Sequence, residues 1–102
     1  MFVIVPGTSQ KITMTLPNET GELTAVYITV KQKNGVTIEH DISKCEITGN
    51  VVSTILTQEE TLQLKPKTIT RVQLRGITKN GDPIATEIYD AYTYETLKAG
   101  AI

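Results

Sequence analysis

The feature that most constrains the fold of this chain is a period of two in its apolar residues. Ile12, Met14 and Leu16, for example, alternate with lysine and threonine residues. Such alternation is typical of a β-strand that buries one face, whereas an amphipathic helix repeats its apolar residues about every 3.6 positions. The pattern therefore predicts an all-β protein, and the spaces between the strands leave no room for a crossover helix.

Turn residues separate the alternating segments at intervals of roughly ten residues. Asn34-Gly35 and Asn80-Gly81 each lie between two such segments, and Asn-Gly accepts the positive φ angles of a tight hairpin turn. Gly49-Asn50 predicts a third hairpin, and residues 17–21 break the chain after the first long strand. We expect about seven strands, at residues 12–16, 25–31, 36–40, 45–48, 51–56, 69–78 and 84–92.

Short strands with regular turns are typical of an antiparallel sandwich or barrel, and we expect an immunoglobulin-like β-sandwich. A chain of 102 residues suits a single domain, so residues 1–102 are expected to form one unit. The ends at residues 1–5 and 93–102 are apolar and are interpreted as arms. We expect at least one of the two arms to dock on a neighbouring subunit.

One short helical turn is predicted at residues 57–62. Thr57 and Glu60 have the spacing of a capping box, in which each side chain accepts a hydrogen bond from the other residue's backbone N–H. Leu62 and Leu64 would then seal this turn against the core. In the strands that follow, the alternation places two sets of residues inward: Thr70, Val72 and Leu74, and then Ile84, Thr86 and Ile88.

The charges are balanced, with 10 basic and 11 acidic residues interspersed along the chain. A nucleic-acid-binding protein needs a concentrated basic face to neutralise phosphates, so no nucleic acid partner is expected. No apolar stretch approaches the roughly 20 residues of a membrane-spanning helix, and no membrane partner is expected. The N-terminus lacks the features of a secretory leader, which predicts a soluble protein made in the cytoplasm.

Residues that could carry chemistry are few. His40 is the only histidine and Cys45 the only cysteine, too few for a zinc site of several such ligands, and no cofactor motif is present. We expect His40 to lie on the surface and Cys45 to act as a small core residue. An enzyme is therefore not expected, with no catalytic, metal or cofactor residues. The alternative is a cysteine hydrolase that pairs Cys45 with His40.

Aromatic and apolar residues near the two ends suggest contacts with other proteins. Tyrosine is common at interfaces because it buries a large area and keeps a polar tip. Tyr27 and Tyr89, predicted to lie opposite the core, would instead suit a carbohydrate-binding face. The candidate assembly contacts are Phe2, Val3, Ile4, Tyr92, Tyr94, Leu97 and Ile102.

Three segments carry a resemblance to a known group of proteins. They are Pro6-Gly7-Thr8 with the strand that ends at Pro17, Leu56-Thr57-Gln58-Glu59-Glu60-Thr61-Leu62, and Val72-Gln73-Leu74-Arg75. Together they resemble small structural proteins of tailed bacteriophages and prophages of Gram-positive, clostridia-like bacteria. They are also similar to the N-terminal β-sandwich module of phage upper-baseplate proteins. The resemblance spans residues 6–92; baseplate modules continue into a longer region, whereas this sequence stops at Ile102.

The resemblance implies a non-enzymatic virion structural protein. An accessory or decoration protein that docks on the capsid lattice is the expected role, with other virion proteins, such as the major capsid protein, as partners. We expect it to be located in the virion and to be oligomeric on the particle. One alternative is a tail or baseplate adaptor, and another is a β-sandwich module that binds carbohydrate or a host surface.

Overall fold

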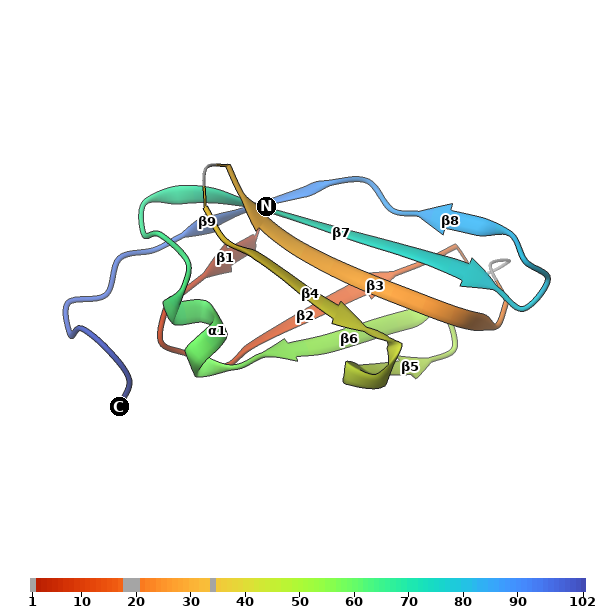
Figure 1. The fold of residues 1–102 in the computed structure, drawn as a ribbon, viewed down its shortest axis with the longest axis horizontal. Coiled ribbons are helices and arrows are strands. Elements are labelled where there is room, and N and C mark those ends of the chain that lie inside the picture. Colours follow the sequence, from red (N-terminus) through yellow and green to blue (C-terminus); the bar gives the residue numbers. More distant parts are fainter. Residues whose placement is uncertain (1, 18–20, 34) are drawn as a thin grey trace.

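The computed structural model describes residues 2–17, 21–33 and 35–102, and they form a mostly β protein with two sheets. A six-stranded sheet and a three-stranded sheet face each other as a sandwich, with one short α-helix at the end of the smaller sheet (Figure 1). The molecule is elongated, with principal extents of 47 × 24 × 19 Å. The prediction of a two-sheet β protein is therefore confirmed.

The larger sheet has the strand order β1-β9-β7-β3-β4, and β8 pairs with β7 beyond β9; the smaller sheet has the order β2-β6-β5. All neighbouring strands are antiparallel except β1 and β9, which are parallel. The elements are β1 (Phe2–Ile4), β2 (Gln10–Thr15), β3 (Leu23–Gln32), β4 (Thr37–Asp41), the 3₁₀ turn η2 (Ile42–Lys44), β5 (Cys45–Thr48), β6 (Val51–Leu56), α1 (Gln58–Leu62), β7 (Thr68–Thr78), β8 (Pro83–Ala85) and β9 (Tyr89–Thr93).

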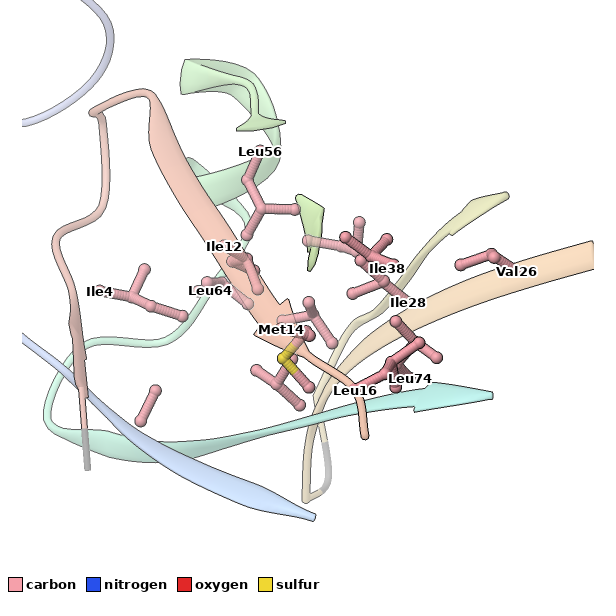
Figure 2. Packing of buried hydrophobic residues seen from close by; sticks show 14 residues of the cluster. Ile4, Ile12, Met14, Leu16, Val26, Ile28, Ile38, Leu56, Leu64 and Leu74 are labelled. Atoms are coloured by element: carbon pink, nitrogen blue, oxygen red, sulfur yellow. The ribbon is translucent and has the colours of Figure 1, made fainter. Parts of the chain in front are cut away.

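Alternation along the strands produces the core as predicted. In β7, Thr70, Val72 and Leu74 point inward and are fully buried, while Arg71 and Arg75 are exposed. Ile12, Met14 and Leu16 from the smaller sheet and its end pack against Val26, Ile28, Ile38 and Leu74 from the larger one (Figure 2). The hydrophobic surface buried between the two sheets is the main force that holds the sandwich together.

The described residues contain nine strands rather than the expected seven. One addition is β1, and the other arises because the expected strand at residues 84–92 is divided at Thr86. The Thr86 hydroxyl accepts a hydrogen bond from the Leu74 backbone N–H at 3.1 Å, where a regular ladder would use a backbone carbonyl. The chain therefore changes register there. Ile84 packs against the core, but Ile88, which was predicted inward, is 47% exposed, and that prediction was wrong.

The turns at Gly49 and Gly81 are confirmed as hairpins. Gly49 (φ +60°) joins β5 to β6, and Gly81 (φ +88°) joins β7 to β8. Positive φ is costly for residues with a β-carbon, so glycine suits both positions. The predicted Asn34-Gly35 turn includes Asn34, and the break at 17–21 includes residues 18–20; these residues, like Met1, lie outside the described ones.

The predicted helical turn forms, with Thr57 as its N-cap. The Thr57 hydroxyl accepts from the Glu60 N–H at 3.1 Å, and the Glu60 carboxylate accepts from the Thr57 N–H at 2.9 Å, which completes the capping box. Leu64 is buried as expected, while Leu62 is half-buried. Within the part of the chain that the structure describes, no helix is long and apolar enough to cross a membrane.

Candidate docking surface

An exposed apolar row crosses three strands at one end of the larger sheet. The register places Tyr92 of β9 between Val3 of β1 and Ile69 of β7. Directly paired residues project from the same side of a sheet, and this side is the outer one because the alternating residue Ala91 is fully buried. Three strands that are far apart in the sequence thus bring these side chains together on the outer face.

Tyr94 extends this row. Its ring meets the ring of Tyr92 edge to face, with 5.5 Å between the ring centroids. Val3, Ile69 and Tyr94 are 41%, 40% and 47% exposed, and Tyr92 is half-buried between them. We call these four residues, Val3, Ile69, Tyr92 and Tyr94, the tyrosine patch. A contiguous apolar surface with tyrosine at its centre is typical of a protein interaction site.

The chain leaves the tyrosine patch as an arm, residues 95–102. Every residue of the arm is exposed, and Leu97 and Ile102 are each 98% exposed. Glu95, at the start of the arm, forms an ion pair of 2.9 Å with Lys67, and this hydrogen bond raises the pKa of the Lys67 ammonium. The arm then runs away from both sheets, past α1 (Figure 1).

The structure divides the seven predicted contact residues. Val3, Tyr92 and Tyr94 come together in the tyrosine patch, whereas Leu97 and Ile102 lie on the arm. Ile4 is fully buried, and Phe2 is half-buried against the core, so these two side chains serve the fold. Ile69 was missed, because only the register of β7 against β9 reveals that it lies beside Tyr92.

The N-terminal segment belongs to its own domain. β1 pairs with β9 along its length, and the Tyr94 N–H donates to the Ile4 carbonyl oxygen at 2.9 Å. The expectation that an arm docks on a neighbour therefore does not apply to residues 2–4. Their sequence is apolar because Ile4 fills the core and because the segment forms the edge strand of the larger sheet.

A depression lies on the outer face of the larger sheet, at the end away from the tyrosine patch, and we call it the outer cleft. It encloses about 310 Å³ and is lined by residues that include Tyr27, Thr29, Glu39, Arg75, Ile77 and Pro83. Tyr27 is 46% exposed and stands beside Arg75 in the register of β3 and β7. Tyr89 does not share this face, because it pairs with the buried Val72 and so projects from the core side of the sheet.

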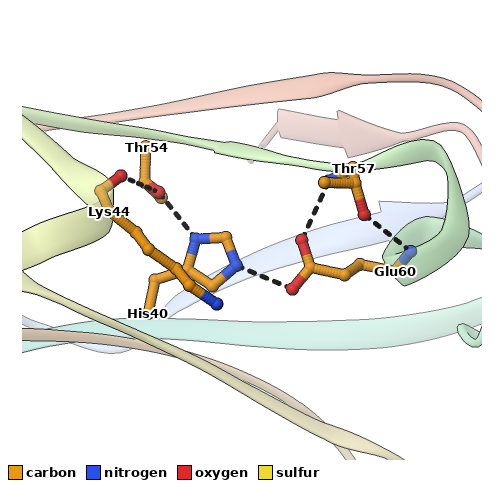
Figure 3. A network of polar contacts seen from close by, with 5 residues as sticks. All are labelled: His40, Lys44, Thr54, Thr57 and Glu60. Carbon is orange, nitrogen blue, oxygen red and sulfur yellow. Dashed lines mark hydrogen bonds and ion pairs between the residues drawn. The ribbon is translucent and has the colours of Figure 1, made fainter.

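His40, expected on the surface, is buried in a polar network between the sheets and α1 (Figure 3). Its Nδ1 lies 2.7 Å from the Thr54 hydroxyl, and that hydroxyl donates its proton to the Lys44 carbonyl oxygen at 2.9 Å. Nε2 lies 2.7 Å from the Glu60 carboxylate, which as an anion can only accept. In this arrangement the Thr54 hydroxyl and the Glu60 carboxylate engage the two ring nitrogens of His40.

The electrostatics of Glu60 agree with this pairing. Partial burial opposes its ionisation, but hydrogen bonds from the Thr57 backbone and from His40 outweigh burial and hold the pKa of the Glu60 carboxyl below its usual value. The network thus connects the two sheets and α1, and both ring nitrogens of His40 form hydrogen bonds in it.

The Cys45–His40 pair that a cysteine hydrolase would need is not assembled in this arrangement. Both nitrogens of His40 are bonded to Thr54 and Glu60 rather than to the thiol. Partial burial raises the pKa of the Cys45 thiol, which disfavours the reactive thiolate. Across residues 2–17, 21–33 and 35–102, no three His, Cys, Asp or Glu side chains are grouped as metal ligands.

Comparison with known proteins gives a fold relationship. No protein-family model and no curated protein sequence matches the chain. Among solved structures, part of a cycloalternan-degrading enzyme from Trueperella pyogenes superposes on 86% of this chain, with a TM-score of 0.61 and 15% sequence identity. The match covers only 11% of the length of that enzyme. At this identity the likeness describes the fold alone: sandwiches of this form also occur as a small part of a larger protein.

Proposed function

We propose that this chain is a non-enzymatic docking protein, an accessory structural component of a tailed-bacteriophage particle that attaches to the capsid lattice. The observation that carries the docking role is the tyrosine patch. Three of its four residues lie on three strands, and Tyr94 directly follows β9. Together they combine apolar area with two tyrosine hydroxyls, and the arm with its exposed Leu97 begins directly beside them. The virion setting is supported by the sequence resemblance alone.

A repeated lattice would make such a surface effective. A patch of four residues buries less area than the roughly 800 Å² per partner of a typical stable interface. Weak individual contacts become durable when many copies attach to one symmetric particle, because dissociation then requires several contacts to open together. The partners on this proposal are other virion proteins, first the major capsid protein.

Binding to purified particles assembled without this protein would test the role. The wild-type protein should saturate a fixed number of sites on the particle, and electron microscopy of labelled protein should locate them on the head. The double variant Val3→Ser with Tyr94→Ser should bind at least ten times more weakly, since about 1.4 kcal/mol is a factor of ten and each side chain contributes on that scale.

A matched control changes Ile55, which is 58% exposed on β6 of the opposite sheet. Ile55→Ser should leave particle binding unchanged. Saturation of tail sites instead of head sites would replace the capsid role with that of a tail or baseplate adaptor. Binding to neither part, or equal binding by the patch variant and wild type, would overturn the proposal.

The proposal includes an immunoglobulin-like arrangement of the sandwich. Its support is that the chain changes sheet repeatedly, from β1 to β2, from β2 to β3, from β4 to β5 and from β6 to β7. Such crossings between two sheets are a feature of Greek-key sandwiches. An experimental structure with a different set of sheet crossings would contradict this assignment.

The outer cleft favours a second candidate function, a carbohydrate- or host-surface-binding module. Tyr27 offers an exposed ring, and Arg75 and Glu39 offer charged hydrogen-bonding groups beside it. Glycan-array binding that Tyr27→Ala abolishes and Tyr89→Ala leaves intact would support this function, because only Tyr27 lines the cleft. Cycloalternan is a natural first probe, given the fold likeness to part of an enzyme that degrades it.

A further inference from the structure

We infer that the tyrosine patch of one copy receives the arm of a second copy, so that two chains exchange arms reciprocally. The inference rests on the proposed function only in treating the patch as an assembly surface, and it adds a second copy of this chain to the partners of that surface. Its structural basis is the relation between β1, the patch and the arm.

β1 offers a free strand edge next to the patch. It is the last strand of the larger sheet in the order β1-β9-β7-β3-β4, so within the described residues one side of its backbone pairs with no strand. The unpaired N–H and C=O groups of an edge strand can receive an added strand from another chain. A strand added there would lie beside Val3 and lengthen the apolar row of Val3, Tyr92 and Ile69.

The arm has the sequence pattern of such a strand. Leu97, Ala99 and Ala101 alternate with Thr96, Lys98 and Gly100, so residues 96–101 have one apolar side with a period of two, and Ile102 falls on the other side. Leu97 is 98% exposed, so its apolar surface is uncovered in the single chain. Placed on the edge of β1, the apolar side of the arm would cover the outer side of Val3 and come within reach of Tyr92.

The arm's course in its own chain directs it away from its own patch. The Gly100 carbonyl oxygen lies 3.8 Å from the position that a β-carbon would occupy on Gly7, so the arm passes the loop that follows β1. Figure 1 shows it continuing past α1 rather than back along β1. To reach the free edge of its own β1, the chain would have to reverse at Glu95, which is held by Lys67.

No such reversal is needed when the arm binds to the β1 edge of a second copy related by a twofold axis. Tyr94 belongs to the patch and also immediately precedes the arm, so two copies that approach patch to patch bring each arm beside the partner's β1. An arm of this length spans at most about 27 Å when extended, which is enough to run the length of a three-residue edge strand. The contact is then the same on both chains, as a closed dimer requires.

Cysteine cross-linking between differently marked chains tests the exchange. One chain carries Val3→Cys and the other carries Leu97→Cys, both with Cys45→Ser, and they are mixed and oxidised. A covalent dimer containing one of each chain is the expected product. Ile55→Cys in place of Val3→Cys is the control and should give none, because Ile55 is exposed on the opposite sheet. Failure of the Val3–Leu97 pair to cross-link would overturn the inference.

Light scattering after size exclusion provides a second measurement that needs no cross-link. Wild-type protein should show a concentration-dependent dimer, and Leu97→Glu should weaken it roughly 100-fold, since each dimer buries two copies of Leu97. Thr96→Glu, on the polar side of the arm, should weaken it far less. A wild-type protein that stays monomeric at all concentrations would contradict arm exchange.

The two proposals fail in different ways. A protein that is monomeric in solution but binds particles through the patch would retain the docking role and lose the arm exchange. A protein that forms the Leu97-dependent dimer but binds no particle would retain the exchange and lose the virion role.

Discussion

The Nε2 atom of His40 lies 2.7 Å from the Oε2 atom of Glu60, and this hydrogen bond joins β4 of the larger sheet to α1. Through Thr54 the same imidazole also reaches β6 of the smaller sheet. Glu60 uses its other oxygen to close the capping box with Thr57. One carboxylate therefore fixes the start of the helix and its position against both sheets.

The first prediction concerns the charge of Glu60. Glu60→Gln keeps the shape and can still cap the helix, but it loses the ionic hydrogen bond to His40. Hydrogen bonds to charged groups contribute about 1.5–3 kcal/mol, so we expect the free energy of unfolding in urea to fall by about 1–2 kcal/mol. Glu59→Gln is the matched control because Glu59 is exposed on the same helix, and its change should lie within about 0.5 kcal/mol. Equal effects of the two variants would contradict the structural role of the pair.

The second prediction is the pH dependence of that contribution. The pKa of Glu60 in the folded protein lies below its ordinary value of 4.5, so between the two values the unfolded chain binds more protons. Stability therefore rises with pH in this window, is fully present above it, and is lost as the pH falls through the folded pKa. The difference in unfolding free energy between wild type and Glu60→Gln should shrink as the pH falls below about 4.5.

Urea denaturation at a series of pH values would measure this difference. The pKa of Asp41 is also lowered, by its hydrogen bonds with Ser43. Asp41 is present in both proteins, so its contribution to the free energy of unfolding cancels in the difference. A difference that stays constant down to pH 3 would mean that Glu60 is not the group responsible.

Much of the fold could be predicted from local sequence. The capping box depends on residues three positions apart, and the hairpins at Gly49 and Gly81 depend on adjacent residues, so each signal is contained in a few positions. The inward faces of β2, β3 and β7 follow from alternation. These predictions hold because the hydrophobic period and the turn chemistry indicate the same strands.

The remaining features depend on contacts between distant segments. In the sequence His40 looks like a lone surface histidine. The fold brings Thr54 and Glu60 to its two ring nitrogens, and these hydrogen bonds offset the cost of burying the polar ring. The tyrosine patch likewise requires β1 to pair with β9 across almost the whole sequence. The wrong prediction for Ile88 has a local cause, the Thr86 hydroxyl. A threonine in a predicted strand, however, gives no sign that its hydroxyl will replace a backbone carbonyl as the acceptor in the strand ladder.

The third prediction tests whether β1 belongs to the fold or to a docking arm. Ile4 is fully buried and Val3 is 41% exposed, although they are adjacent. Ile4→Ala should reduce the free energy of unfolding by about 2–4 kcal/mol because it leaves a cavity in the core. Val3→Ala should cost less than about 1 kcal/mol. Urea denaturation of the two variants measures this, and an Ile4→Ala variant as stable as wild type would show that β1 contributes little to the core.

The fourth prediction concerns the close contact between β7 and β3 at Gly76. A β-carbon on Gly76 would lie 2.7 Å from the Ala25 carbonyl oxygen, next to the register shift between Leu23 and Ala25. Because the obstacle is backbone, Gly76→Ala must displace β3 and should cost about 1–3 kcal/mol of unfolding free energy. It should also disturb the outer cleft, which Gly76 and Ala25 both line.

Thermal and urea unfolding would measure the stability change, and Lys79→Ala is a suitable control on the same hairpin. The Lys79 ammonium is exposed and lies 3.7 Å from Glu22, so its removal should change stability by less than about 0.5 kcal/mol. Backbone amide chemical shifts should move in β3 for Gly76→Ala and stay in place for Lys79→Ala. If Gly76→Ala is as stable as wild type with unmoved β3 signals, the approach of the two strands is looser than the register requires.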